Sequence, residues 1–142
     1  MANPTDNFRY HLQFEVRDYE CDLQGIVNNA VYQNDLEHTR HQFLKSMGID
    51  FAEITQRGVH LVVVRAEVDY KRSLTSGDTF WVGVNLERIS RLKFAFLQEI
   101  FRAPDDELVV AARIIGVALS AGGRPVPLEE AHPAMGELPA GK

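Results

Sequence analysis

Residues 22–32 read DLQGIVNNAVY and lead from a polar loop into a predicted long helix. From Ala30 onward, apolar residues recur with the 3.6-residue period of an amphipathic helix. Asn28 or Asn29 can cap the start of this helix, and Gly48 stands where a helix ends in the left-handed region. The expected buried face consists of Tyr32, Leu36, Thr39, Phe43 and Met47.

Strand patterns surround this helix. Residues 10–17 alternate weakly before it, and a short stretch at 51–56 that can form a helix follows it. Tight turns then separate the remaining strands, which implies antiparallel pairing. One long helix and one antiparallel sheet predict an α+β domain of two layers. The later strands are expected within 62–70, 80–86, 92–96 and 108–119, and the tail from Pro125 is expected to be irregular.

Composition indicates a globular protein of modest size. The 142 residues are 45% hydrophobic and carry a net charge of −5. Scattered cations predict no nucleic-acid binding, and the lack of a long apolar run predicts no membrane span. A single cysteine and a polar start favour a reducing, cytoplasmic location. We expect one domain over 1–142, with residues 1–8 and 130–142 flexible.

The last predicted strand, 108–119, is apolar on both faces. A single helix can cover only one face of a sheet, so the other face needs a different cover. The commonest cover is a second copy of the same chain. We therefore expect a homo-oligomer.

Asp22 is the leading candidate for chemistry. It precedes the helix start, where unpaired backbone N–H groups and the positive end of the helix dipole lie. Such N–H groups can hold a developing oxyanion, while a carboxylate attacks a carbonyl or activates water. On spacing alone, however, an Asp ahead of a helix is more often a turn or capping residue.

The stretch 22–32 resembles the motif of the 4-hydroxybenzoyl-CoA thioesterase family. That motif is an Asp, two variable residues, a Gly, two aliphatic residues, two variable residues and, three further on, a Tyr. The likeness extends over most of the chain, through Glu37, Arg40, Phe43, Leu44, Gly48-Ile49, Asp69-Tyr70, Ser76-Gly77-Asp78 and Gly123-Arg124-Pro125-Val126-Pro127.

The resemblance implies a hotdog fold, a long helix wrapped by a five-stranded antiparallel sheet. It implies hydrolysis of an acyl-CoA or acyl-carrier-protein thioester, in dimers with a continuous sheet or dimers of dimers, with the site between two subunits. It implies Asp22 as nucleophile or general base, with Gly25 in the same catalytic loop, and the Asn29 N–H as the group that polarises the thioester carbonyl.

The carrier is left open by a departure from the bacterial pattern. Bacterial acyl-CoA thioesterases of this family often have a Tyr-His pair where this chain has Asn28 and Asn29. The string from Asn28 to Tyr32 more closely resembles plant plastid acyl-lipid thioesterases, which act on acyl-carrier-protein thioesters. Either carrier is therefore possible, and Asn28 and Tyr32 are predicted to bind substrate.

Other candidates carry weaker expectations. Lys71, Arg72 and Arg91, with Arg88 near the same turn as Arg91, could meet phosphates of CoA, although solvated charges are the usual reading. Cys21 has no nearby His to act as its base. His38 and His41 suit a solvated helix face better than a metal site. We expect no metal and no cofactor.

Two alternative classes of function stay open beside hydrolysis. A hotdog hydratase or dehydratase would need a catalytic His near the helix, which the stretch from Ile26 to Tyr32 lacks. A non-catalytic sensor would tolerate loss of the carboxylate, whereas Asp22 is present. Among other carboxylates, Asp35 and Glu37 lie on the helix, and Glu37 is expected to pair with Arg40 or His41 one turn on.

Overall fold

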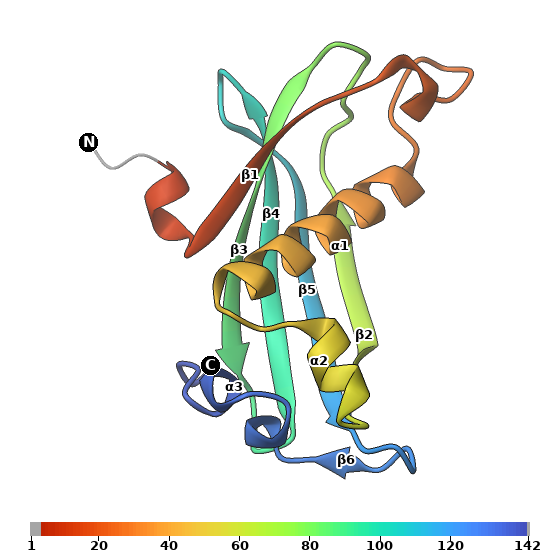
Figure 1. The fold of residues 1–142 in the computed structure, drawn as a ribbon. Helices are drawn as coiled ribbons and strands as arrows, with labels where there is room; N and C mark the ends of the chain where they lie inside the picture. Colours follow the sequence, from red (N-terminus) through yellow and green to blue (C-terminus); the bar gives the residue numbers. More distant parts are fainter. Residues whose placement is uncertain (1–3, 142) are drawn as a thin grey trace. The chain divides into compact units, whose positions relative to one another are not determined.

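A computed structural model describes residues 4–141 of the chain (Figure 1). Its longest helix is α1 (Asn29–Ser46), and the other α-helices are the short α2 (Phe51–Gln56) and α3 (Pro133–Gly136). The strands are β1 (Tyr10–Glu15), β2 (His60–Tyr70), β3 (Thr79–Arg88), β4 (Lys93–Ala103), β5 (Glu107–Leu119) and β6 (Pro125–Val126). Single turns of 3-10 helix occupy Pro4–Asn7, Asp18–Glu20 and Leu128–Glu130.

The strands form one antiparallel sheet in the order β1-β3-β4-β5-β2, with the two-residue β6 paired to β5. The pairing of β1 with β3 places Tyr10 opposite Val84 and Glu15 opposite Thr79. The predicted α+β class is therefore confirmed, and β6 adds a short sixth strand to the five expected. No described helix is long and apolar enough to cross a membrane.

By their contacts, the described residues divide into two compact units. The first contains the chain up to Phe43, together with Val68–Asn85 and Gln98–Ala112. The second contains Leu44–Glu67, Leu86–Leu97 and the chain from Arg113 onward. The prediction of a single domain over 1–142 stays a prediction, and residues 1–3 and 142 lie outside the described part.

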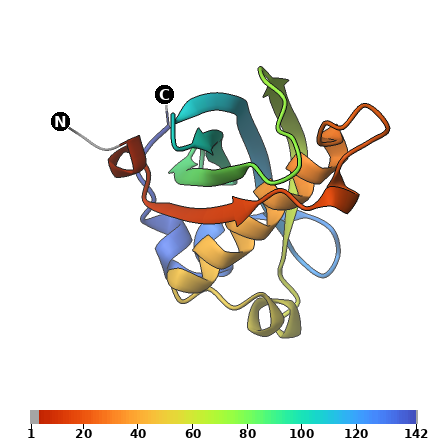
Figure 2. The same cartoon turned by 90° about the horizontal axis from the view of Figure 1, so that it is seen from above.

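In the first unit, α1 runs beside β1 in the opposite direction (Figure 2). The Tyr10 ring stacks on Phe43 near the start of β1, and Phe14 meets His38 edge-on further along. Four of the five residues predicted for the buried helix face are buried: Tyr32, Leu36, Thr39 and Phe43. The fifth, Met47, follows the end of α1 and is half-buried. Burying these side chains holds α1 in place far more firmly than helix propensity alone could.

The second unit contains the chain's tail, and the prediction of an irregular tail is wrong. The tail forms β6, a turn of 3-10 helix and α3, and it buries Leu128, Ala131 and Met135 completely. Arg57 fixes this segment to α2 by donating hydrogen bonds to the carbonyls of Glu130 and Ala131. The apolar residues between the tail's prolines make this packing favourable.

The expectation of a bare face on β5 is also wrong. Both faces of this strand are largely covered within one chain, since Val109 and Val117 on one face are 1% and 6% exposed, and Val110 on the other is fully buried. Exposed apolar side chains lie instead on β2, where Val63 and Val64 are 51% and 54% exposed. β5 therefore gives no reason for a partner, and the oligomer stays a prediction.

Candidate active site

The loop that carries Asp22 is closed by backbone hydrogen bonds within the first unit. The Asp22 N–H donates to the Ile26 carbonyl at 2.9 Å, and the Asn28 N–H donates to the Glu20 carbonyl at 3.2 Å. Gly25 has a φ of +80°, a conformation that side-chain-bearing residues rarely adopt, which explains the glycine at this turn. The loop therefore forms a closed turn that ends at the start of α1.

The segment before β3 holds this loop from the other side. The Val27 N–H donates to the Leu74 carbonyl at 2.9 Å, and Ile26 forms an isolated antiparallel bridge with Thr75. The hydroxyl of the buried Tyr32 accepts a hydrogen bond from the Leu74 N–H at 2.9 Å. Tyr32, predicted to bind substrate, thus makes a structural contact that joins α1 to this segment.

The Asp22 side chain is exposed and only half engaged. Its Oδ1 accepts hydrogen bonds from the N–H of Gln24 at 2.8 Å and, more weakly, of Ile26 at 3.5 Å. Its Oδ2 has no donor among residues 4–141. One oxygen therefore stabilises the turn, as expected of an Asp ahead of a helix, and the other is free to meet solvent or a ligand.

The first residues of α1 show how its backbone N–H groups are used. The Asn28 side chain caps the helix, because its Oδ1 accepts a hydrogen bond from the Ala30 N–H at 2.8 Å. The Asn29 N–H has no acceptor in the described part of the chain. An unpaired N–H at the positive end of a helix can stabilise negative charge on a carbonyl oxygen.

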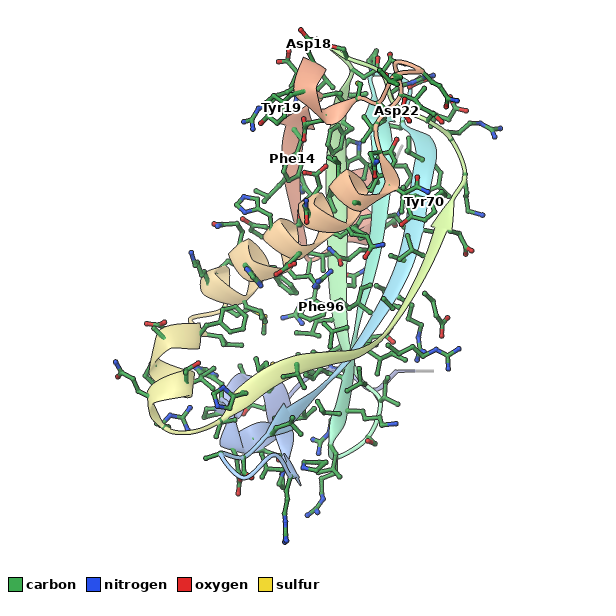
Figure 3. All side chains as sticks on the ribbon, turned by 90° about the vertical axis from the view of Figure 1, so that its right-hand side faces the viewer. Phe14, Asp18, Tyr19, Asp22, Tyr70 and Phe96 are labelled. Atoms are coloured by element: carbon green, nitrogen blue, oxygen red, sulfur yellow. The ribbon has the colours of Figure 1, made fainter. Side chains whose placement is uncertain are left out.

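A polar pair that the sequence did not predict lies one turn further along α1. Gln33 Nε2 donates a hydrogen bond to the Tyr70 hydroxyl at 3.1 Å. Tyr70 ends β2, and its ring lies 6.0 Å from that of Tyr32, centre to centre. Figure 3 shows Tyr70 and Asp22 toward the end of the unit where α1 begins. The four-residue spacing of Asn29 and Gln33 was visible in the sequence, but their pairing with Tyr70 was not.

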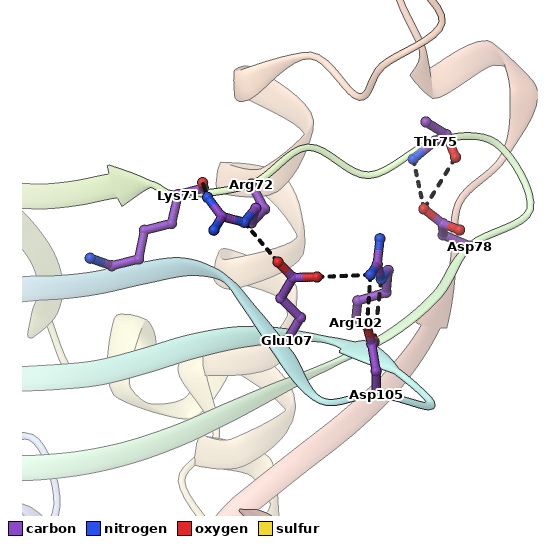
Figure 4. A network of polar contacts seen from close by, with 7 residues as sticks. All are labelled: Lys71, Arg72, Thr75, Asp78, Arg102, Asp105 and Glu107. Carbon is purple, nitrogen blue, oxygen red and sulfur yellow. Dashed lines mark hydrogen bonds and ion pairs between the residues drawn. The ribbon is translucent and has the colours of Figure 1, made fainter.

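The predicted phosphate-binding cations are differently placed. Arg72 is already paired, with its Nε 2.7 Å from Glu107 Oε1, and Glu107 in turn meets Arg102 at 2.8 Å (Figure 4). Lys71 points away from this network and lines a depression of about 500 Å³ with Arg72, Glu107 and Leu108. Arg91 is exposed in the second unit.

The other helix carboxylates differ from Asp22 in their surroundings. Glu37 Oε1 lies 3.7 Å from His41 Nε2, which confirms one of the two pairings expected for Glu37. Asp35 is half-buried, and burial, reinforced by the negative charge of Glu20, raises its pKa to about 7 although Arg17 opposes the shift. A group that titrates near neutral pH is a functional candidate on electrostatic grounds.

The profile of the thioesterase-like superfamily matches residues 16–134. An acyl-acyl carrier protein thioesterase of Arabidopsis thaliana chloroplasts is 38% identical over 117 residues, covering 82% of this chain and 62% of the relative. A long-chain acyl-CoA thioesterase of Escherichia coli is 28% identical over 107 residues, covering 75% of this chain and 80% of the relative.

Among solved structures, a 1,4-dihydroxy-2-naphthoyl-CoA thioesterase from Synechocystis superposes with a TM-score of 0.83 at 19% identity. The match covers 89% of this chain and 94% of the other. At this identity the likeness shows the fold, and the predicted hotdog fold is confirmed. The chain spans 62% of the length of the Arabidopsis relative, so that protein's activity is not transferred whole.

Proposed function

Because this chain belongs to the thioesterase-like superfamily, we propose that it hydrolyses an acyl thioester, with Asp22 as the reacting carboxylate. The observation that carries this proposal is that two polar groups without a partner lie at the same loop–helix junction. One is Oδ2 of Asp22, and the other is the Asn29 N–H. Thioester hydrolysis needs both a base or nucleophile and a donor for the oxyanion.

The chemistry follows two routes that use the same groups. In the first, Asp22 takes a proton from water, and the resulting hydroxide attacks the thioester carbonyl. In the second, Asp22 attacks the carbonyl directly and water hydrolyses the mixed anhydride. In both, negative charge builds on the carbonyl oxygen, where the Asn29 N–H stabilises it. The carbon–sulfur bond breaks, and the thiolate leaves and takes up a proton.

The substrate carrier is CoA or acyl carrier protein. The names of the Arabidopsis and Escherichia coli relatives support one carrier each. The ion pair of Arg72 with Glu107 reduces the positive charge available for the phosphates of CoA, whereas Lys71 still offers a cation. We also place the activity in the cytoplasm, as the sequence predicts, and in a homodimer or dimer of dimers.

An assay of two variants tests this proposal. Asp22→Asn keeps an oxygen for the Gln24 N–H, so the loop is retained while the basic oxygen is lost. We expect its turnover of acyl-CoA and acyl-carrier-protein thioesters to fall by about 10²–10⁴, the usual effect of losing a positioned base. The matched control is Glu37→Gln, which removes an exposed carboxylate on α1 and should keep the wild-type rate.

Two outcomes would count against the proposal. Wild-type protein that hydrolyses neither class of thioester is not a thioesterase. Asp22→Asn protein that keeps near-wild-type turnover shows that another group is the carboxylate, and Asp35 is then the next to test. Thermal unfolding of each variant checks that any loss of rate does not come from loss of the fold.

A further inference from the structure

The Gln33–Tyr70 pair is held in place from several directions. Tyr70 is the last residue of β2, and the next residue is fixed by a hydrogen bond from the Lys71 N–H to the Val109 carbonyl at 2.8 Å. The Tyr70 ring lies 6.0 Å, centre to centre, from the ring of Tyr32. Tyr32 is itself 2% exposed and is hydrogen-bonded to Leu74. The Tyr70 hydroxyl accepts the hydrogen bond from Gln33. The Tyr70 hydroxyl is therefore positioned by both β2 and α1.

The pair retains at least one unused donor and one unused acceptor. The Tyr70 O–H proton has no acceptor, and Gln33 Oε1 has no donor, within residues 4–141. Rotating the carboxamide of Gln33 by 180° would reverse their mutual hydrogen bond and still leave at least one donor and one acceptor. Tyr70 is 38% exposed, so a ligand can reach it. Such a pair can bind a secondary amide through either of its polar groups: the Tyr70 O–H can donate to the amide C=O, and Gln33 Oε1 can accept from the amide N–H.

We propose that Gln33 and Tyr70 bind the secondary amide next to the sulfur in the thiol arm of the substrate. This proposal rests on the proposed thioesterase function. CoA and acyl carrier protein share that arm, in which two methylene groups separate the thioester sulfur from the amide nitrogen. From the carbonyl carbon to that nitrogen an extended arm spans about 5–6 Å. Four residues of α-helix advance about 6 Å, which is the separation of Gln33 from Asn29 along α1.

The chemistry of the pair favours the thiol arm over the acyl group. An aliphatic acyl chain lying against Gln33 and Tyr70 would displace water from a hydroxyl and an amide without replacing its hydrogen bonds. Such unpaired polar groups are costly to desolvate. An amide would replace a hydrogen bond that the pair otherwise makes to water. The pair is thus a specificity-determining contact for the carrier, independent of which acid the carrier holds.

The test compares two small thioesters of the same acid. One is the N-acetylcysteamine thioester, which has the amide, and the other is the n-pentyl thioester, which replaces it with methylene groups. In wild-type protein we expect a higher kcat/KM for the first. Tyr70→Phe and Gln33→Leu should each lower kcat/KM for the first by about 3–10-fold, the effect of one lost hydrogen bond, and leave the second within twofold. Tyr19→Phe, which alters another exposed tyrosine, is the matched control and should change neither.

Each contrary outcome has a distinct meaning. If Tyr70→Phe lowers kcat/KM equally for both thioesters, the pair positions α1 and does not contact the amide, and the inference is wrong. It is also wrong if the loss follows the acyl group when the acid is varied, or if neither variant differs from wild type. Acyl-CoA and acyl carrier protein thioesters are assayed alongside. If wild-type protein is inactive on all of these substrates, the proposed function itself is refuted. If it is active only on acyl-CoA or acyl carrier protein thioesters, the variants are assayed on those substrates. With them, Tyr70→Phe must raise KM at least threefold with kcat unchanged.

Discussion

At the start of α1, the backbone N–H and the side chain of Asn29 can be tested separately. Asn29→Ala removes the side chain but keeps the N–H, so hydrolysis should fall only modestly. Asn29→Pro removes the N–H, and proline is tolerated at the first helical position. Asn28 caps the helix through its side chain, and capping residues typically have a non-helical backbone, which is the conformation that a following proline favours.

The expected difference in kcat between the Asn29→Pro and Asn29→Ala variants is large. Loss of one oxyanion donor typically lowers kcat by about 10²–10³. Steady-state kinetics on both variants, after a circular-dichroism melt shows that each is folded, measures it. Equal rates for folded Pro and Ala variants would place the oxyanion donor elsewhere. An inactive Ala variant would instead assign the chemistry to the amide side chain.

Asp35 makes a prediction about pH and stability. Its pKa is about 7 in the folded protein and near 3.8 when unfolded, so the folded state binds the proton more tightly. Stability associated with the neutral carboxyl is therefore full below pH 4 and is lost as pH rises toward 7. Asp35→Asn should remove this loss. We expect it to melt about 2–4 °C above wild type at pH 8, since solvent around the half-buried group screens the penalty to ~1 kcal/mol.

The pH profile of the melt distinguishes this effect from a general change in packing. At pH 4 the wild-type carboxyl is already neutral, so the two proteins should melt at the same temperature. A difference that is constant from pH 4 to pH 8 would show that Asp35 does not titrate in this range. Ionised Asp35 faces Glu20 and Arg17 across the first unit, and Tyr32 on its own helix, so Glu20→Gln should also reduce the pH dependence.

At the scale of an element, the cap of α1 can be removed without touching its buried face. Asn28→Ala deletes the oxygen that accepts the Ala30 N–H. We expect a loss of about 1 kcal/mol in the free energy of unfolding, measured by urea denaturation. Asn28→Asp retains the acceptor and should restore the stability. An Asn28→Ala variant with an unchanged free energy of unfolding would show that the cap does not stabilise the protein.

The ends of α1 could be predicted because their signals are local. Asn28 and Gly48 adjoin the helix, and Gly48 has the positive φ expected of it, +81°. The cover of β5 could not be predicted in the same way. An apolar residue in a strand is equally consistent with an internal neighbour and with a second chain. Only the fold shows that side chains on both faces of β5 are buried.

In the candidate site, too, local features could be predicted from the sequence and contacts between distant residues could not. The position of Asp22 on a loop that leads through Gly25 into the helix followed from the sequence pattern, whereas the hydrogen bonds that close this loop did not. The contact between Gln33 and Tyr70 joins residues 37 positions apart. It depends on where the end of β2 meets α1, and neither residue has a neighbour in sequence that would indicate it. The pairing of Arg72 with Glu107 was hidden for the same reason.

At the scale of the whole molecule, the strand order leaves β2 at one edge of the sheet. An edge strand presents unpaired backbone groups, and natural proteins usually protect it with charge, irregularity or a cover. β2 has eleven residues and carries two exposed valines, Val63 and Val64. A long strand with apolar side chains at an open edge favours pairing with a second copy, which would continue the sheet.

Light scattering at micromolar concentration should therefore give a mass of about 32 or 64 kDa, for two or four chains of 16.0 kDa. Val64→Lys places a charge on the edge strand, the usual natural protection against pairing, and should shift the mass toward that of one chain with the circular-dichroism spectrum unchanged. Leu23→Lys, the same kind of change on a fully exposed loop residue, is the control and should keep the wild-type mass. A wild-type mass of 16 kDa would refute both the oligomer and a site shared between subunits, because no partner would then be present to complete it.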